Sequence, residues 1–375
     1  MQGSVHGSVR AIAAADDLRF MKLALSLGRR GLGRTWPNPA VGAVIVKDGM
    51  IVGRGWTQPG GRPHAEVEAL RRAGPAAGGA TLYVTLEPCS HFGKSPPCAD
   101  AVIAAGISRL VSAIEDSNPE VAGQGHARLR AAGIAVDIGI GADEARRDHA
   151  GHISRMTRGR PCVMLKLAIS ADGKVGAAGR RPVSITGDAV HDRVHLLRAQ
   201  NDAIMIGIGT ALADDPMLTC RLPGMAKNSP VRIVADSMLR LPLNSRLVKS
   251  AYETPVWAIA GMSAPEDAEF RLLPLGVEVL RLPESTGSLD LKDAMGFLSA
   301  KGITRLMVEG GPTLAAALIK ADLIDQAVLF HSEKIVGADG IEALDTDALA
   351  MLKQRLKLIA TESVGPDRQE TYERR

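Results

Sequence analysis

The chain has 375 residues, more than one hydrophobic core usually supports, so its length predicts two domains. Its composition, 46% hydrophobic and 23% charged residues, is typical of a protein that folds around a core. The net charge of +4 comes from basic residues interleaved with acidic ones, and three Trp, three Tyr and five Phe offer few rings for stacking on unpaired bases. We therefore expect no nucleic-acid partner.

No stretch of the sequence reaches the roughly 18 apolar residues that a membrane span needs, and the N-terminal segment lacks the features of a secretion signal. We expect a cytoplasmic protein that does not bind a membrane. A reducing cytosol would keep the cysteines as thiols, and they are too few for a disulfide framework. The cysteines are Cys89, Cys98, Cys162 and Cys220.

Predicted helices and strands alternate along the first 145 residues. Asp17 is a candidate N-cap for a helix over residues 18–30. An Asp-Gly turn at Asp48 and Gly49 joins two apolar runs into a predicted β-hairpin over residues 41–55. This alternation predicts an α/β domain over residues 1–145. Its other elements are predicted as helices at 66–74, 98–107 and after 119, and as strands at 80–86, 109–114 and 134–140.

The stretch 145–161 is basic and shows no clear period, so we interpret residues 146–160 as a linker; a nucleic-acid-binding tail is the alternative. Strand-like apolar runs separated by helical or turn-rich segments fill the rest of the chain. They predict a second α/β domain over residues 161–375. The runs lie at 162–170, 203–209, 231–236, 255–260, 277–282, 305–311 and 326–331.

His64, Cys89 and Cys98 have the residue types of a catalytic zinc site. One imidazole and two thiolates are the usual ligands of a tetrahedral zinc whose fourth position stays open to water. Glu66 follows His64 by two residues, and the two side chains can share a site only at a helix start, since within a helix they point to different faces. There Glu66 would take a proton from the zinc-bound water and later protonate the departing amino group.

The same residues match the known signature of the zinc nucleobase deaminases, H-x-E followed by P-C-x-x-C. In this chain Pro88-Cys89 and Cys98 enclose the longer insert SHFGKSPP. The alternative interpretation is a structural cysteine pair, a helix-capping histidine and a solvated glutamate. The four residues in this order favour a hydrolytic deaminase of an amino-substituted ring, with one zinc per chain.

Two strand-to-glycine-to-helix turns in the second half can leave backbone N–H groups free for phosphate, which suits a dinucleotide. One turn contains Gly207 and Gly209, and the other leads into Pro312. Leu212 stands where the Rossmann fingerprint has its third glycine, so a Rossmann fold is only the alternative here.

The motifs PNPAVGAVIV, HAEVEAL, EPCSHFGKSPPC, LKLAISADGKV, GTALADDPMLTCR and VEGGPTL resemble those of the bifunctional deaminase/reductases of riboflavin biosynthesis. The resemblance covers about residues 16–330. It implies a cytidine-deaminase-like three-layer domain followed by a dihydrofolate-reductase-like domain. It also implies that a diaminopyrimidinone carrying a phosphoribosylamino group loses a ring amine, and that NADPH then reduces the ribosyl group to ribityl.

The resemblance further assigns site residues. Asn38 matches a pocket-lining asparagine of the deaminase, and His91 and Lys94 offer cationic donors for a 5′-phosphate. The cofactor positions of the reductase are matched by Ala168, Ser184, Thr210, Asp214, Ser237, Gly311, Pro312 and Thr313. The substrate positions are matched by Arg198, Leu218, Arg221 and Glu309, to which we add Lys166, a charged residue in an apolar strand.

The sequence departs from the family at three positions, one in the second site and two at the expected domain junction. Ser184 stands where many members have a tryptophan, and His149 and His152 replace residues that are usually asparagine and aromatic. An alternative function is a zinc deaminase of nucleobases or RNA whose second domain senses a nucleotide without turning it over. A zinc-stabilised regulatory module is a third, but it would have no use for Glu66. We expect a homo-oligomer, either a dimer or a tetramer.

Overall fold

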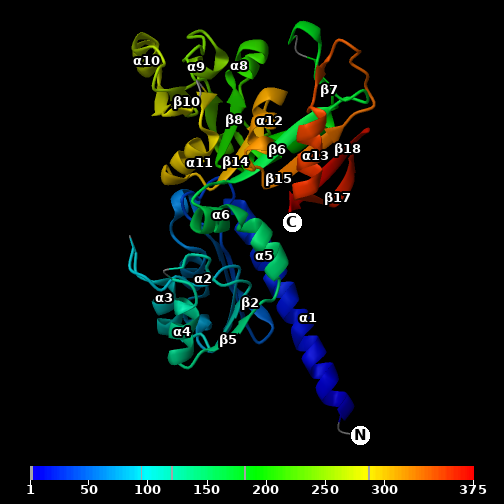
Figure 1. The fold of residues 1–375 in the computed structure, drawn as a ribbon. Coiled ribbons are helices and arrows are strands. Elements are labelled where there is room, and N and C mark those ends of the chain that lie inside the picture. The colour runs from blue at the N-terminus through cyan, green and yellow to red at the C-terminus, as the bar shows by residue number, and fades with distance from the viewer. Residues whose placement is uncertain (1–2, 94, 120, 181–182, 286–287) are drawn as a thin grey trace. The chain divides into compact units, whose positions relative to one another are not determined.

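The computed structural model describes residues 3–93, 95–119, 121–180, 183–285 and 288–375. The chain forms two compact units, Met1–Gly159 and Arg160–Arg375. Each unit is built on a β-sheet of its own (Figure 1). None of the helices in the described part of the chain is long and apolar enough to cross a lipid bilayer.

The N-terminal unit contains a five-stranded sheet in the order β2-β1-β3-β4-β5. The predicted hairpin is formed by β1 and β2, and Asp48 and Gly49 in its turn have φ of 53° and 74°, as a two-residue type I′ turn requires. The last three strands are parallel, so their carboxyl ends lie at one edge of the sheet. The strands are β1 (Gly42–Lys47), β2 (Met50–Trp56), β3 (Thr81–Val84), β4 (Arg109–Ser112) and β5 (Ala135–Ile138).

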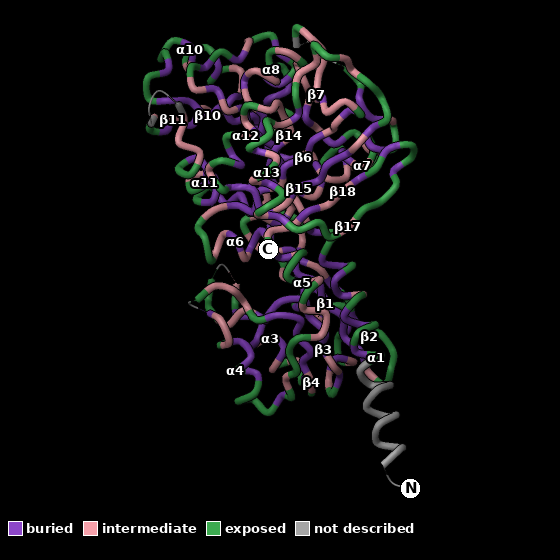
Figure 2. Tube along the Cα trace, turned by 45° about the vertical axis from the view of Figure 1, so that its right-hand side comes forward, coloured by how far each residue is buried: buried purple, intermediate pink, exposed green. Residues whose placement is uncertain are grey.

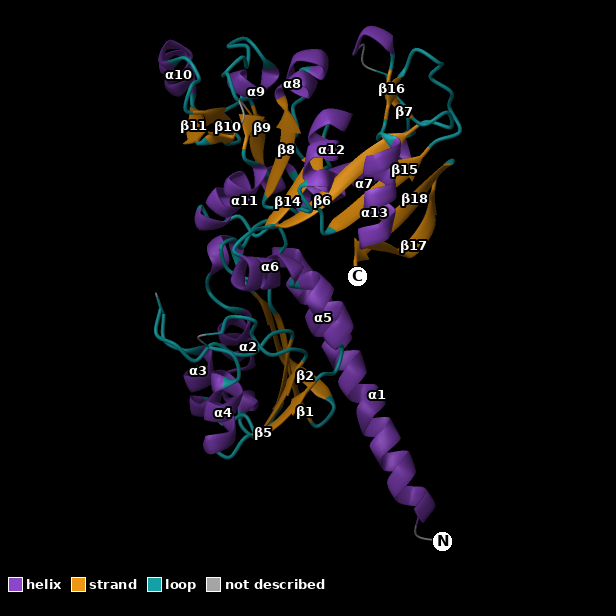
Figure 3. Ribbon diagram, in the orientation of Figure 1, coloured by secondary structure: helices purple, strands orange, loops and turns teal. Residues whose placement is uncertain are grey.

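Helices cover both faces of this sheet, which gives the unit three layers (Figure 3). One face is covered by α1 and α5, and the other by α2, α3 and α4. Val44, Ile45, Leu82 and Leu110 are fully buried between the layers (Figure 2). The helices are α1 (Gly3–Gly28), α2 (Ala65–Ala73), α3 (Cys98–Ala104), α4 (Gln124–Ala131), α5 (Ala142–Asp148) and α6 (Ala150–Arg158).

The structure differs from two local expectations in this unit. The prediction that Asp17 caps a helix was wrong, because α1 begins at Gly3; the buried Asp17 carboxylate instead accepts hydrogen bonds from Tyr83 (2.6 Å) and Arg109 (2.8 and 2.9 Å). Residues 146–160, which show no clear period in the sequence, are mostly helical. Small and polar residues on the buried face of α6 hide its periodicity from sequence inspection.

The C-terminal unit contains a nine-stranded sheet in the order β11-β10-β9-β8-β14-β6-β15-β18-β17 (Figure 3). The strands from β11 to β15 pair in parallel, and β18 pairs antiparallel with both β15 and β17 at one edge. This strand order differs from that of a Rossmann fold, which does not require an antiparallel hairpin at the edge of its sheet. The strands are β6 (Cys162–Ile169), β8 (Ala203–Gly207), β9 (Val231–Ala235), β10 (Val256–Gly261), β11 (Val277–Leu282), β14 (Arg305–Glu309), β15 (Gln326–His331), β17 (Leu356–Val364) and β18 (Asp367–Arg374).

Helices and two small strand pairs complete this unit. The strands β7 (Lys174–Gly176) and β16 (Ile341–Glu342) pair with each other, as do β12 (Glu284–Ser285) and β13 (Ser288–Leu289). The core of the sheet is fully buried at Ile204, Ile206 and Phe330. The helices are α7 (Asp188–Ala199), α8 (Ile208–Asp214), α9 (Arg246–Lys249), α10 (Glu266–Leu272), α11 (Leu291–Ala300), α12 (Pro312–Lys320) and α13 (Thr346–Arg355).

Candidate functional sites

His64, Cys89 and Cys98 meet in the N-terminal unit. His64 is the N-cap of α2, with φ of −69° and ψ of 160°, and Cys98 is the first residue of α3. The Nδ1 atom of His64 lies 3.2 Å from the Sγ of Cys98 and 3.7 Å from the Sγ of Cys89, whose sulfur also accepts the backbone N–H of Cys98 (3.3 Å). The three ligand atoms lie within 4.8 Å of one another. Metal–ligand bonds of about 2.0–2.3 Å fit such a cluster, so this donor set suits zinc.

Glu66 is the second residue of α2 and is only 3% exposed. Because His64 lies before the first helical turn with an extended backbone, both side chains can face one site, as the sequence predicted. Burial raises the pKa of Glu66; the charge of His64 opposes this shift and that of Cys89 adds to it, with a net pKa of about 7. A carboxyl group that titrates near neutral pH can both accept and release a proton during a reaction.

The segment before His64 is held by Asn38 from one side. The Asn38 Nδ2 donates a hydrogen bond to the carbonyl oxygen of Gly61 (2.9 Å). Gly61 has φ of 84°, and a Cβ at this position would lie 2.3 Å from that same Nδ2, so only glycine fits. Asn38 therefore lies beside the metal cluster and fixes the segment that carries His64.

His91 and Lys94 belong to the loop between Cys89 and Cys98. His91 is exposed at this loop, and Lys94 lies outside the described residues. Arg62, which sequence inspection did not single out, donates from Nη1 to the Oγ of Ser95 in the same loop. Its position directly before Pro63 and His64 is the feature of the sequence that could have identified it as a candidate site residue.

A second cluster of potential metal ligands in this unit, formed by Glu87, Glu115 and His126, has a structural explanation. The buried Glu87 carboxylate accepts the backbone N–H groups of Asp116 (3.0 Å), Gly123 (2.9 Å) and His126 (3.0 Å). Three such bonds occupy most of its acceptor capacity. Glu87 thus fixes the chain between β4 and α4, on which the loop after Cys89 also depends.

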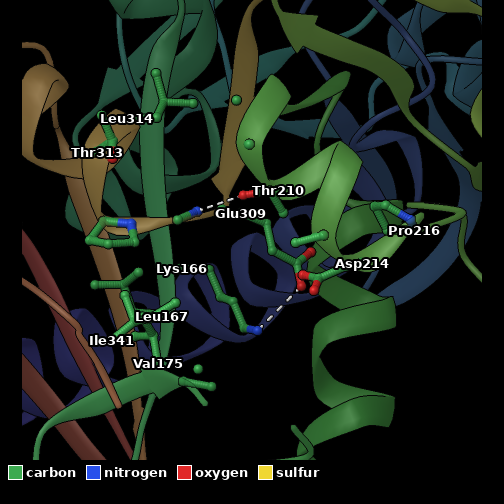
Figure 4. Close-up of a pocket in the computed structure, with 18 of the residues that line it drawn as sticks. Lys166, Leu167, Val175, Thr210, Asp214, Pro216, Glu309, Thr313, Leu314 and Ile341 are labelled. Carbon is green, nitrogen blue, oxygen red and sulfur yellow. Dashed lines mark hydrogen bonds and ion pairs between the residues drawn. The ribbon is translucent and has the colours of Figure 1, made fainter. Parts of the chain in front are cut away.

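The C-terminal unit has a pocket of about 350 Å³ beside the carboxyl ends of β6, β8 and β14 (Figure 4). In an open α/β sheet this edge is the usual place for a ligand. Ten of the residues predicted for the second site line the pocket. They are Lys166, Ala168, Arg198, Thr210, Asp214, Leu218, Glu309, Gly311, Pro312 and Thr313.

Glu309 is the electrostatic centre of this pocket. Its carboxylate lies 3.3 Å from the Nζ of Lys166 and accepts hydrogen bonds from Arg198 at 2.8 and 3.0 Å. Burial alone would raise the pKa of Glu309, but the two cations hold it at about 2. Burial and the charge of Glu309 together raise the pKa of the neighbouring Asp214 (Figure 4). Glu309 is therefore kept ionised, and the pKa of the carboxyl group beside it lies above its ordinary value.

The two glycine turns predicted from the sequence lie against each other at this pocket. Gly311, the N-cap of α12, donates its N–H to the Oγ1 of Thr210 on α8 (2.9 Å). A Cβ on Gly311 would lie 3.3 Å from that oxygen, tighter than most real contacts, so glycine favours this approach. The first turn of α12 leaves backbone N–H groups available to an anionic ligand, which fits a nucleotide cofactor.

Three predicted residues do not line the pocket, namely Ser184, Ser237 and Arg221. The Ser184 Oγ donates to the carbonyl oxygen of Thr186 (3.2 Å), and its neighbour Val183 reaches the pocket instead. Val175 and Ile341, which sequence inspection missed, line the pocket from the small β7–β16 pair (Figure 4). Their segments are too short to carry a strand period.

His149 and His152 lie inside the N-terminal unit. The Nε2 of His149 lies 3.1 Å from the Oγ1 of Thr85, and the Nε2 of His152 lies 2.9 Å from a carboxylate oxygen of Asp116. Both side chains thus anchor the terminal helices of this unit to its sheet and loops.

Two family descriptions match the chain. The one described as the cytidine and deoxycytidylate deaminase zinc-binding region matches residues 14–114. The one described as the RibD C-terminal domain matches residues 161–369.

Curated proteins and solved structures resemble the chain over nearly its whole length. The riboflavin biosynthesis proteins RibD of Escherichia coli and Aquifex aeolicus are 43% and 42% identical to it, and the matches cover 94% of this chain and 98% and 96% of theirs. The structure of Acinetobacter baumannii RibD aligns with a TM-score of 0.85 and 36% identity, over 96% of this chain and 99% of that one. A Thermotoga maritima diaminohydroxyphosphoribosylaminopyrimidine deaminase/5-amino-6-(5-phosphoribosylamino)uracil reductase aligns with a TM-score of 0.83 and 32% identity, over 97% and 100%.

Proposed function

The chain belongs to the family of bifunctional deaminase/reductases of riboflavin biosynthesis, and we propose that each of its two units carries out one of the two reactions with the residues described above. The fold is a cytidine-deaminase-like domain followed by a dihydrofolate-reductase-like domain, and the enzyme is a deaminase and a reductase. Because the relatives match both units, a nucleotide-sensing second domain is not favoured. The observation that carries the assignment of residues is that His64, Cys89 and Cys98 meet in one cluster, with the buried Glu66 carboxyl against Cys98.

In the deaminase, His64, Cys89 and Cys98 would hold one zinc ion. Zinc bound by three protein ligands supplies a water activated for attack on the ring carbon that carries the amine. Glu66 would carry one proton of the attacking water to a ring nitrogen and the other to the departing amine, which would leave as ammonia. Its burial and near-neutral pKa suit a group that must exchange protons repeatedly. Asn38 keeps the His64 segment in place, and His91 and Lys94 are proposed to bind the 5′-phosphate.

In the reductase, the α12 N-terminus and Thr210 would hold NADPH, together with Ala168, Asp214, Pro312 and Thr313. NADPH supplies the hydride that is delivered to C1′ of the opened ribosyl group. Ser184 and Ser237 remain cofactor predictions that the pocket lining does not support.

Charged groups of the same pocket would manage the substrate and its protons. Lys166, Arg198 and Leu218 would contact the substrate, and Arg221 would add a charge from outside the pocket lining. Asp214 is our candidate for the proton donor, because it lines the pocket beside Glu309 and burial raises its pKa above the ordinary value.

Several broader properties remain proposals. We propose that the substrate is a phosphorylated pyrimidine and that the enzyme works in the cytoplasm, where the four cysteines, none of which is in a disulfide, would stay reduced. Assembly into a homo-oligomer remains a prediction from the family resemblance.

Metal analysis combined with two activity assays tests the proposal. The wild-type protein should hold one zinc per chain and release ammonia from the phosphorylated diaminopyrimidine. Cys98→Ala should lose both, yet reduce the deaminated intermediate with NADPH. Cys162→Ala, which removes a buried cysteine of the other unit, is the matched control and should keep its zinc. Full zinc and full deamination in Cys98→Ala would show that the metal site is wrongly assigned.

A further inference from the structure

Arg62 lies between the metal cluster and the loop that follows Cys89. It precedes His64 by two residues, and its guanidinium donates to the Oγ of Ser95 in that loop. A Cβ built on Gly93 would lie 3.6 Å from the Arg62 Nη2 and 3.9 Å from the Nε2 of His91, so the same glycine contacts both side chains. The guanidinium and the imidazole therefore face the same short stretch of loop.

Among the described residues Arg62 has no carboxylate partner, and its guanidinium donates to the neutral hydroxyl of Ser95. Arg128 and Arg72 of the same unit, by contrast, lie 2.6 Å from the carboxylates of Asp100 and Glu68. Arg62 is also partly buried, which weakens the screening of its charge by water. A partly buried guanidinium without an acidic partner is suited to receive an anion.

We propose that Arg62 binds the 5′-phosphate of the deaminase substrate, at the loop that follows Cys89 and next to His91. The inference rests on the proposed deaminase function, in which the substrate carries a phosphate monoester on its ribosyl group. A guanidinium presents a planar fork of N–H donors that matches two phosphate oxygens, whereas a hydroxyl or an imidazole offers a single donor. One Arg62 nitrogen can hold Ser95 while others contact the phosphate.

The contact with Ser95 gives this residue a second effect on substrate binding. Through it, Arg62 fixes the loop that carries His91 relative to the His64 segment, which Asn38 fixes from its other side. A phosphate bound by both Arg62 and His91 would therefore place the pyrimidine at a set distance from Glu66 and the metal ligands. Arg62 is a binding and positioning residue here and takes no part in proton transfer.

Kinetics with two substrates tests the proposal on the full-length enzyme. The deamination rate is measured with the phosphorylated diaminopyrimidine and with the same compound after removal of its phosphate. Arg62→Met should lower kcat/KM for the phosphorylated compound by roughly tenfold to a hundredfold, the effect of one charge-assisted contact, and leave the dephosphorylated compound within twofold of wild type. Inorganic phosphate should inhibit the wild type more strongly than this variant.

Two further variants make the result decisive. Arg62→Lys keeps the charge but not the fork, and should lose less than Arg62→Met. Arg54→Met removes an exposed arginine of β2 in the same unit and should behave as wild type. Zinc content is measured in each, and wild-type ammonia release establishes the deaminase itself. An equal loss on both substrates would mean that Arg62 only supports the loop, and no loss on either would mean that the phosphate binds elsewhere; both results overturn the proposal.

Discussion

Glu66 and Glu68 are both buried carboxylates of α2, two residues apart, but their surroundings differ. Glu68 accepts hydrogen bonds from Arg71 (2.9 and 3.1 Å) and Arg72 (2.9 Å), and these contacts, Arg71 first, lower its pKa. Glu66 has no such arginine, and burial raises its pKa. One carboxylate is thus committed to an ion pair, while the other is free to exchange protons.

Replacing Glu66 by glutamine should abolish deamination and leave the metal in place. General acid–base catalysis by one side chain contributes about 10²–10⁴ in rate, and Glu66 serves more than one proton transfer, so ammonia release should fall by at least that factor. Zinc content and NADPH-dependent reduction should stay at wild-type levels. The matched control is Glu68→Gln, which should lose some stability but deaminate normally. Near-normal ammonia release by Glu66→Gln would remove this residue from the mechanism.

His126 is a buried polar residue without a described role in either reaction. It is fully buried, and neither ring nitrogen has a hydrogen-bond partner among the described residues. Burial lowers the pKa of His126 below its ordinary value of 6.5. The positive charge of Arg130 lowers this pKa as well, whereas the negative charges of Glu87 and Glu115 oppose the shift. Since the unfolded chain then takes up a proton more readily than the folded one, stability is lost as the pH falls through about 6.5.

Replacing His126 by leucine should therefore stabilise the N-terminal unit, and more so in acid. An unpaired buried polar group costs about 1–3 kcal/mol, which the apolar side chain of similar size avoids. At pH 7.5 the temperature at which heating releases zinc should be several degrees higher in the variant than in wild type. The difference between these two temperatures should be larger at pH 5.5. The exposed His191 offers the control His191→Leu, which should change neither value. A gap that does not depend on pH would mean that His126 does not titrate on unfolding.

At the scale of elements, the sequence predicted the strands and turns whose structure is determined by residues close together in the chain. The Asp48-Gly49 hairpin and the buried parallel strands β6, β8 and β14 have strong local signals, namely a turn dipeptide and continuous apolar runs. The C-terminal hairpin of β17 and β18 was missed. Most residues of the outer strand β17 are exposed, and the sequence of β18, DRQETYER, is largely polar. Its strand structure depends on pairing with β15, which no local window of sequence contains.

Deleting this hairpin tests how far the C-terminal unit relies on it. β18 pairs with β15 over residues 326–331, and Arg374 donates from Nε to the buried Asp325 (3.2 Å). Removing residues 356–375 would leave a central strand with an unpaired edge, so reductase activity should be lost and this unit should become protease-sensitive. Zinc content should be unchanged. As a control, Ile359→Ser changes an exposed residue at the irregularity of β17 and should remain active. Normal reduction by the truncated chain would contradict this dependence.

At the scale of the molecule, the first site was more predictable than the second. The proposed zinc ligands and Glu66 occur in two short motifs with distinctive residue types, so their order alone indicates the chemistry. The reductase pocket is lined from many separate segments, including Val175 and Ile341, which are ordinary apolar residues until the fold brings them to Glu309. Arg62 was overlooked for a related reason, since its significance depends on the absence of an acidic partner, a spatial property.

The two units should work as separate proteins when the chain is divided after Gly159. Each has its own core, and each proposed site draws its residues from one unit only. Most of the linker expected at 146–160 is helical, and a cut inside Ala150–Arg158 would break α6. Gly159 follows α6, and Arg160 pairs with Asp325 of the C-terminal unit at 2.6 and 2.8 Å. We expect residues 1–159 to bind one zinc and release ammonia, and residues 160–375 to oxidise NADPH only with the deaminated intermediate. Activity that appears only when the two pieces are mixed would instead show that one site needs the other unit, and the division of labour proposed above would have to be revised.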